Sequence, residues 1–399
     1  MDALTTPSNW QRVRLGDIAE IKRGASPRPI ENPKWFCANS NVGWVRISDI
    51  SKNSRFLYKT AQKLSKKGIE KSRFIKQNSL IMSMCATIGK PIITKIDTCI
   101  HDGFVVFENP KIDLNYLYYF LCYIEKEWLE SGQQGSQVNL NVDLIKNKEV
   151  FCPKDLDEQI AIANILSGVD RYLYSLDALI LKKESVKKAL SFELLSQRKR
   201  LKGFNQNWQR VRLGDICEIG NGGAYETLIV ENGNFKLISL NSIDIDGNLK
   251  NTMKRVNFYD NSLKQDDIVM VLSDVAHGDF LGLCAVIPSN DYVLNQRMGR
   301  LRKRNDCINI LFLRLYINAN QKYFKMQGQG SSQLNLSKKA IEDFEILLPP
   351  LNEQIAIANI LSGLDHEIIS LKNKKRQFEN IKKALNHDLM SAKIRVLKK

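Results

Sequence analysis

The stretch EQIAIANILSG occurs twice in this chain, at Glu158–Gly168 and again, without a change, at Glu353–Gly363. The second copy begins 195 residues after the first, in a chain of 399 residues. An exact repeat of this length is not expected by chance, and a repeat decides how every other motif is interpreted. The period is much longer than a solenoid unit and matches the size of a domain. The sequence therefore predicts a tandem duplication.

Two further motifs are repeated in the same order around this stretch. WQRVRLGDIAEI at Trp10–Ile21 corresponds to WQRVRLGDICEI at Trp208–Ile219, and SQVNL at Ser136–Leu140 corresponds to SQLNL at Ser332–Leu336. The residues between these motifs match poorly between the two halves. Each half is thus a shared frame that surrounds a divergent body.

The repeated stretch begins an apolar pattern with alternating steps of four and three residues, which predicts a long helix with a heptad seam. Asp157 and Asn352 are the expected N-caps. Glycine in a helix interior costs about 1 kcal/mol, so we expect another helix to approach closely at Gly168 and Gly363. The seam positions are Ile162, Leu166, Val169, Leu173, Leu176 and Ile180 in the first copy, and Ile357, Leu361, Leu364, Ile368 and Leu371 in the second.

The divergent bodies have a different pattern. Short apolar runs broken by glycine within Phe74–Ile93 and Asp267–Ile287 predict strands, while Leu114–Trp128 and Ile308–Lys322 predict amphipathic helices. Each body is therefore expected to be a mixed α/β domain, and the whole chain α+β. The predicted domains are a first body at 1–154, a first helix at 155–202, a second body at 203–349 and a second helix at 350–399.

The charge of the chain favours a polyanionic partner; the alternative is a generally lysine-rich proteome. Fifty-nine lysines and arginines oppose 43 acidic residues, giving a formal charge of +16, and cations that neutralise phosphates add affinity that is independent of base sequence. No apolar run is long enough for a membrane span, and no signal peptide is evident. The eight cysteines are scattered and the four histidines form no ligand pattern. We expect free thiols in a reducing cytoplasm and no metal site.

Four sequence elements together resemble the specificity subunits of Type I restriction-modification enzymes. They are WxxVxLGD at Trp10–Asp17 and Trp208–Asp215, the Met-Ser…Ile-Gly-Lys element at Met82–Lys90, SQxNL before each helix, and the proline followed by EQ at Pro350–Gln354. The first copy departs from the last element, because Asp155 stands where Pro350 stands and the proline is Pro153. The resemblance covers essentially the whole chain.

This resemblance implies a fold and a role. The fold is α+β, with two target recognition domains separated by two long helices that pair as an antiparallel coiled coil with pseudo-two-fold symmetry. The role is non-catalytic recognition of a bipartite, gapped, asymmetric site in double-stranded DNA. Partners would be two modification subunits, which methylate adenine with S-adenosylmethionine, and restriction subunits, which use ATP and Mg. The subunit itself would hold no cofactor and would act in the cytoplasm.

Two alternatives come from other classes of function: a stand-alone enzyme that modifies nucleic acid, and a coiled-coil scaffold without sequence specificity. Against the enzyme, the only Pro-Pro pair, Pro349-Pro350, lacks the Asn/Asp and the aromatic residue of a methyltransferase motif. Gly220–Gly223 lacks the context of a nucleotide loop and is interpreted as a flexible surface turn. A nuclease site could be suspected at Asp17 and Asp215, but both lie in the shared frame and are interpreted as structural.

Base readout requires Arg or Lys for guanine and Asn or Gln for adenine on accessible loops. A basic turn or a Gln/Gly/Ser loop is also common as a plain solvated connector, so each position has a structural alternative. Trp10 and Trp208 occur in identical frames and are expected to be core anchors. The candidate DNA-binding residues are Lys22, Arg23, Ser26, Arg28, Thr87, Lys90, Gln134 and Gln137 in the first body, and Asn221, Ser273, His277, Gln296, Arg297, Gln329 and Gln333 in the second.

Apolar residues off the heptad seams predict a surface for partner subunits, since exposed apolar stripes commonly mark interfaces. The alternative is that the two helices pair only with each other. The candidate partner-binding residues are Glu158, Gln159, Ile160 and Ile165 in the first copy, and Glu353, Gln354, Ile355 and Ile360 in the second. Leu179, Leu181 and Ile369 extend the same faces.

Overall fold

The computed structural model describes residues 7–51, 55–131, 140–275 and 278–396. The chain divides into two compact units. The first unit contains Met1–Asp177 and Lys374–Lys399, and the second contains Ala178–Asn373. Within the described residues, no helix has the length and apolar character needed to cross a membrane.

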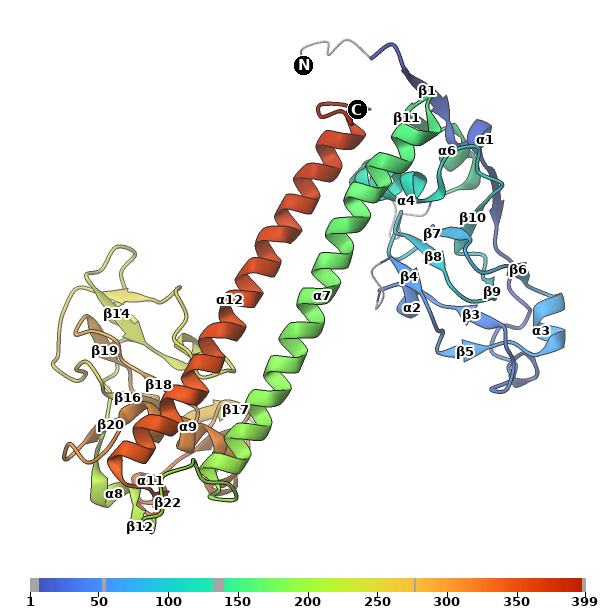
Figure 1. The fold of residues 1–399 in the computed structure, drawn as a ribbon. Coiled ribbons are helices and arrows are strands. Elements are labelled where there is room, and N and C mark those ends of the chain that lie inside the picture. The colour runs from blue at the N-terminus through green and yellow to red at the C-terminus, as the bar shows by residue number, and fades with distance from the viewer. Residues whose placement is uncertain (1–6, 52–54, 132–139, 276–277, 397–399) are drawn as a thin grey trace. The chain divides into compact units, whose positions relative to one another are not determined.

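The body of the first unit is built from three antiparallel or mixed sheets (Figure 1). A small ribbon pairs β1 (Trp10–Arg14) with β11 (Glu149–Pro153) and brings the two ends of the body together. The five-stranded sheet has the order β2 (Glu20–Arg23), β10 (Phe104–Glu108), β7 (Leu80–Ser83), β8 (Pro91–Thr94) and β4 (Phe56–Leu57). The four-stranded sheet has the order β5 (Gln62–Lys63), β3 (Gly43–Val45), β9 (Thr98–Ile100) and β6 (Arg73–Ile75).

Short helices close this body, and one of them carries much of its core. Tyr116, Leu117, Tyr119 and Phe120 of α4 are buried in one cluster with Trp10 and the strands β7 and β10. The described helices of the body are α1 (Leu15–Ile18), the 3-10 helix η1 (Pro33–Trp35), α2 (Ile47–Ser51), α3 (Lys66–Glu70), α4 (Leu114–Tyr123), α5 (Glu125–Ser131) and α6 (Val142–Asn147).

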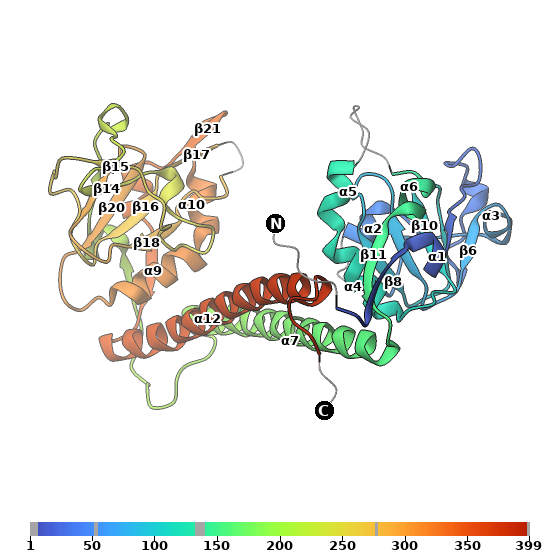
Figure 2. The ribbon, with the colours of Figure 1, turned by 90° about the horizontal axis from the view of Figure 1, so that it is seen from above.

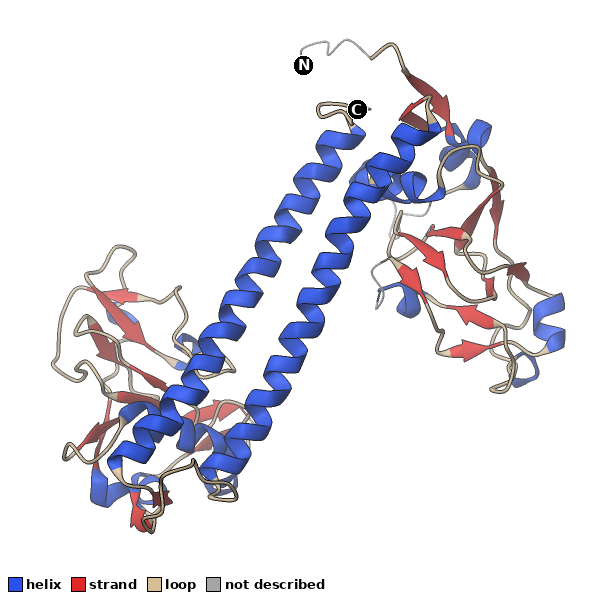
Figure 3. Ribbon diagram, in the orientation of Figure 1, coloured by secondary structure: helices blue, strands red, loops and turns tan. Residues whose placement is uncertain are grey.

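The body of the second unit repeats the frame of the first with a different interior (Figure 3). Its closing ribbon pairs β12 (Gln209–Arg212) with β22 (Glu345–Leu348), and its main sheet has the order β13 (Cys217–Asn221), β20 (Met298–Lys303), β16 (Ile268–Val271) and β18 (Cys284–Val286). A three-stranded sheet has the order β15 (Arg255–Val256), β14 (Phe235–Ile238) and β19 (Tyr292–Leu294), and a ribbon pairs β17 (Ser273–Val275) with β21 (Gln333–Asn335). The described helices are α8 (Leu213–Ile216), the 3-10 helices η2 (Glu226–Leu228) and η3 (Leu240–Ser242), α9 (Ile310–Ala319), α10 (Gln321–Gln327) and α11 (Lys338–Glu342).

Two helices of 40 residues each, α7 (Leu156–Leu195) and α12 (Leu351–Met390), form the predicted coiled coil (Figure 1 and Figure 2). Partner numbers rise along one helix as they fall along the other, so the pairing is antiparallel. The first unit contains Asp170–Lys382 at 2.5 Å, Asp177–Lys375 at 2.6 Å and the ring contact Tyr172–Phe378 at 4.5 Å. The second unit contains Glu184–Lys372 at 2.7 Å, Lys183–Glu367 at 2.8 Å and Lys187–Asp365.

The internal repeat is visible in these contacts. Asp365 lies 195 residues after Asp170, and Lys382 lies 195 residues after Lys187, so Asp170–Lys382 and Asp365–Lys187 are the same pair with the helices exchanged. The predicted seam is also confirmed where it meets the bodies. Ile162 and Leu166 are buried in the first core, and Ile357 and Leu361 in the second.

Two helix details differ from the sequence predictions. Asp157 and Asn352 lie inside the helices and are not N-caps; in the first copy, the carboxylate of Asp155 accepts a 3.0 Å bond from the backbone N–H of Asp157. The close helix approach at Gly168 and Gly363 is also wrong within this chain. A Cβ built on either glycine would meet no heavy atom within 4 Å.

The secondary structure predicted for the bodies is otherwise confirmed. β6, β7 and β8 lie in the first apolar region and β16 and β18 in the second. Each amphipathic segment forms two helices rather than one, with breaks at Ile124 and Asn320. The Gly220–Gly223 segment is not a flexible surface turn. It continues β13, and the backbone N–H of Gly223 donates to the carbonyl of Leu294.

Candidate DNA and partner interfaces

The repeated motifs meet at the start of each long helix. The indole Nε1 of Trp10 donates to Glu158 at 3.2 Å, and the indole of Trp208 donates to Glu353 at 3.0 Å. Trp10 is buried and Trp208 half-buried, each packed against the core of its own unit. The prediction that both tryptophans are core anchors is therefore confirmed.

The glutamines of the repeated stretch join helix, strand and body. Gln159 and Gln354 each accept a 2.8 Å bond from the backbone N–H of an α4 or α9 cap residue, Asp113 or Asn309. Each also donates at 2.8 Å to a backbone carbonyl just before its helix. A buried amide with both ends satisfied fixes its surroundings. This explains why EQ recurs unchanged, and it places these groups inside the units.

The four acidic and amide residues predicted to bind a partner are consequently engaged within their own units. Glu158 is also within 2.8 Å of Asn9, and Glu353 receives two bonds from Arg200, at 3.1 and 2.6 Å. Ile160, Ile165, Ile355 and Ile360 behave differently, with 37–40% of each side chain exposed. The apolar half of the predicted partner surface is thus accessible in the described structure.

In the first body, one residue, Asp102, is hydrogen-bonded to three of the candidate DNA-binding residues. Asp102 accepts a 2.7 Å bond from the hydroxyl of Ser26 and a 3.0 Å bond from Arg28, while Arg23 donates to the backbone carbonyl of Asp102 at 2.7 Å. The hydrogen bond from the hydroxyl of Ser26 is the main cause that lowers the pKa of Asp102, and a backbone hydrogen bond and the nearby cation Arg28 add to it. Arg28 remains largely exposed. Asp102 therefore holds the side chains of two candidate cations, Arg23 and Arg28.

The other first-body candidates do not join this group by any contact in the described structure. Lys22 is paired with both Glu20 and Glu108, at 2.9 and 2.5 Å, so its charge is locally compensated. Thr87 donates to Ser83 at 3.3 Å, and Lys90 follows in the same turn before β8. Gln134 and Gln137 lie outside the described residues.

The second body holds its candidates around a different acid. The side-chain amide of Gln296 donates to Glu226 at 3.2 Å, and Asn295 donates to the same carboxylate at 3.0 Å. Arg297 is exposed next to them. Asn221 ends β13, two residues before a bridge between Gly223 and Asn295. Glycine is required there, because a Cβ on the intervening Gly222 would collide with the backbone carbonyl of Leu294.

The remaining second-body candidates divide into held and exposed groups. The hydroxyl of Ser273 is buried and donates to Asn335 at 2.6 Å, which suits a structural role. Gln333 pairs with Val275 in the β17–β21 ribbon, and Gln329 is exposed next to that ribbon. His277 lies outside the described residues.

The comparisons with known proteins agree on one family. The family described as "Type I restriction modification DNA specificity domain" matches residues 7–183 and, a second time, residues 205–380. The chain belongs to this family. Its members recognise DNA sequence for a multisubunit enzyme whose catalytic work resides in partner subunits, and they need no catalytic cofactor of their own.

Relatives from this specificity family match all or part of the chain. The MjaVIII specificity subunit of Methanocaldococcus jannaschii is 26% identical, covering 99% of this chain and 95% of the relative. The EcoprrI specificity subunit of Escherichia coli is 24% identical over 40% of this chain and 41% of its own length. The S subunit from M. genitalium has a similar fold, with a TM-score of 0.64, 17% identity and 97% of each chain covered.

Sequence reasoning missed two acidic residues that hold candidate DNA-binding side chains. Asp102 and Glu226 lie in the divergent bodies, where no repeat draws attention to them. Asp102 follows a strand, which is a weak sequence signal for a site residue. It also lies far in sequence from the basic segment to which it is hydrogen-bonded, so the sequence did not connect the two. Only the β-sheet register brings the two segments together.

Proposed function

We propose that this specificity subunit reads a bipartite, gapped and asymmetric DNA site, with one half-site read by each divergent body. The observation that carries the proposal is that the family match falls twice on shared frames whose interiors differ. Two unlike readers joined in one chain by paired helices require two unlike half-sites within one DNA site. The proposal includes the domain boundaries between residues 154 and 155, 202 and 203, and 349 and 350.

The loops held by Asp102 and by Glu226 are the proposed readers. Arg23 and Arg28 supply cations suited to guanine or phosphate, while Gln296 and Arg297 supply an amide and a guanidinium. Arg28 and Gln296 are hydrogen-bonded to the carboxylates of Asp102 and Glu226, and Arg23 to the backbone carbonyl of Asp102. These three side chains are already positioned, which reduces the entropy lost on binding. Ser26, Thr87, Lys90, Asn221 and Gln329 are proposed as neighbouring contacts, Lys22 and Ser273 as supports, and Gln134, Gln137, Gln333 and His277 as further candidates.

We place the partner surface on the exposed isoleucines of the long helices. Ile160 and Ile165 repeat as Ile355 and Ile360, so the chain offers two equivalent apolar patches, which fits two modification subunits. Those subunits would bring S-adenosylmethionine for adenine methylation, and restriction subunits would bring ATP and Mg. With chromosomal DNA as the substrate, the assembly would act in the cytoplasm.

The stand-alone enzyme and the non-specific scaffold are the competing functions. The family assignment opposes the enzyme. The scaffold would leave the loops around Asp102 and Glu226 without a role. Neither alternative is favoured by a specific contact in the described structure.

The test is to combine this chain with its cognate methylase subunit, supply the methyl donor and map the methylated adenines on genomic DNA. A two-part motif with a fixed gap supports the proposal. Methylation by this chain alone would support the enzyme, and methylation without a motif would support the scaffold.

A matched pair of variants separates a reader from a merely basic surface. Arg28→Ala is expected to weaken methylation at the motif by tenfold or more (about 1.4 kcal/mol). Arg12→Ala removes an equally exposed arginine from β1, in the shared frame, and is expected to change methylation by less than about twofold. Equal effects of the two variants would contradict the assignment of the loop.

A further inference from the structure

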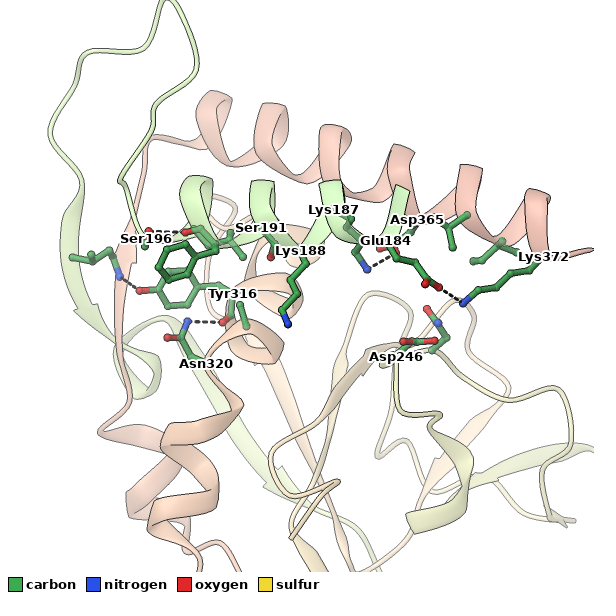
Figure 4. A pocket seen from close by; sticks show the side chains of 17 residues that line it. Glu184, Lys187, Lys188, Ser191, Ser196, Asp246, Tyr316, Asn320, Asp365 and Lys372 are labelled. Atoms are coloured by element: carbon green, nitrogen blue, oxygen red, sulfur yellow. Dashed lines mark hydrogen bonds and ion pairs between the residues drawn. The ribbon is translucent and has the colours of Figure 1, made fainter. Parts of the chain in front are cut away.

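A cavity of about 870 Å³ opens in the second unit, where α7 and α12 meet the body (Figure 4). Its walls include Phe192 of α7, Asp365 of α12, Asp246 of a body loop and Ala319 at the end of α9. All of these residues belong to one compact unit. The volume is in the range of sites that hold a ligand or an inserted side chain.

The internal repeat explains why the space exists. Asp113 and Asn309 cap α4 and α9 and bond to equivalent glutamines, so the two helices correspond with an offset of 196 residues. In the first unit Tyr123 of α4 packs edge-on against His387 of α12, with ring centroids 5.6 Å apart. At the equivalent place in the second unit, Ala319 stands where Tyr123 stands. The loss of an aromatic ring opens the cavity.

The same comparison identifies an unmet polar group. In the first unit Asp170 is bonded on one oxygen to Lys382, and its Oδ2 accepts a 2.6 Å bond from the hydroxyl of Tyr119. The guanidinium of Arg55 lies 4.0 Å from that Oδ2. The carboxylate therefore has a partner for each oxygen.

In the second unit the equivalent acid is Asp365, and only one of its oxygens is paired. Lys187 binds Oδ1, whereas Oδ2 is buried and has no donor among the described residues. Leu315 replaces Tyr119, and Arg314 of α9 turns away to the carbonyl of Gly247 at 2.9 Å. An unpaired buried carboxylate oxygen is costly, and no described residue supplies a donor to it. A donor that enters the cavity reaches this oxygen when the Asp365 carboxylate turns toward the cavity.

We propose that this cavity receives an arginine side chain of a partner protein. The first unit shows the chemistry, because there a guanidinium occupies the place next to the equivalent carboxylate. Asp246 adds a second, exposed acid on the body side of the cavity (Figure 4). Three lysines also line the cavity. Lys187 is paired with Asp365, Lys372 is paired with Glu184 at 2.7 Å, and Lys188 is exposed and can turn to solvent.

A polypeptide fits the opening better than a free cation. Phe192 and Ile369 line the cavity with 55% and 44% of their side chains exposed. Covering these apolar groups stabilises a bound protein surface and adds nothing for a small hydrated ion. The charged centre and apolar rim together resemble the pockets that hold arginine hot spots at protein interfaces.

The first arm of the test uses the full chain and Nα-acetylarginine amide, with the citrulline analogue as a neutral control of the same shape. Ligand-observed NMR is expected to show the arginine probe binding at least about tenfold more tightly than the citrulline probe. Asp365→Asn and Ala319→Tyr should each abolish this preference. Ala189→Tyr, on an exposed face of α7 outside the cavity, should preserve it. Equal binding of the two probes, or a preference that survives Ala319→Tyr, overturns the proposal.

The second arm identifies the source of the arginine and rests on the proposed function. The Kd of the cognate methylase subunit is measured for the wild-type chain, Ala319→Tyr and Ala189→Tyr. Ala319→Tyr is expected to weaken assembly about tenfold, and Ala189→Tyr to leave it unchanged. Assembly that tolerates Ala319→Tyr overturns this partner while the proposed function stands. A wild-type chain that does not assemble refutes the proposed function, and the first arm still decides the cavity.

Discussion

Replacement of Arg55 by methionine is expected to destabilise the first unit by about 3 kcal/mol. The guanidinium is buried, with 9% of the side chain exposed, and it donates to Tyr119 at 2.8 Å, Ser167 at 2.7 Å and Asn115 at 2.6 Å. Three net hydrogen bonds at about 1 kcal/mol each give that figure. Methionine retains most of the apolar stem and can still pack on the aromatic rings that surround Arg55, so packing loss is small.

Urea unfolding followed by tryptophan fluorescence measures this change, because four of the five tryptophans lie in the first unit. The variant Arg12→Met is the control. Its ion pair with Glu149 spans 3.6 Å with both side chains about two-thirds exposed, so its loss should cost less than about 0.5 kcal/mol. A cost below about 1 kcal/mol for Arg55→Met, or equal costs for both variants, would refute the view that this arginine joins body and helix.

Three other predictions follow from the described structure. Burial lowers the pKa of His101 to about 4. The folded state is therefore fully stable above the unfolded pKa of this histidine, near 6.5, and loses stability as the pH falls toward 4. The free energy of unfolding should be about 2 kcal/mol lower at pH 5 than at pH 7, and His101→Gln should remove that difference. Alanine at Gly168 or Gly363 should stabilise the isolated chain by about 1 kcal/mol in the same urea assay, since nothing lies within 4 Å of the added methyl group; destabilisation would show a hidden contact. Ile162→Ala, at a buried position, should lower the free energy of unfolding by about 3 kcal/mol. Ile165→Ala, at a residue that is 40% exposed, should lower it by well under 1 kcal/mol but weaken methylase binding. Similar losses of stability would contradict the assigned helix faces.

Much of the fold could be predicted because the shared frames repeat local patterns. The heptad seam, the strands around Leu80 and Ile268 and the amphipathic helices all follow from periodicities of four, three and two residues. The same logic failed at Gly168, because helix periodicity shows which residues share a face but not whether another helix covers it. The N-cap prediction also failed, because α7 begins at Leu156, before the predicted cap Asp157.

The candidate site was less accessible to sequence reasoning. Side chains such as Arg23 and Arg28 could be selected by residue type, but their shared partner Asp102 is more than 70 positions away and meets them only through the folded sheet. Glu158 and Gln159 show the opposite difficulty. Their exact repetition suggested a shared external partner, whereas the structure uses them for contacts that each unit makes internally.

The most direct test of the central claim, that the divergent bodies read the DNA, is an exchange of bodies within the shared frames. Replacing Ile21–Leu140 by Ile219–Leu336 joins the chains inside motifs that both halves share. Adenine methylation by this chimera with the cognate methylase, mapped by sequencing, should show a two-part motif in which both halves are the one read by the second body. A chimera that assembles with the methylase and still methylates the original two-part motif would contradict the claim.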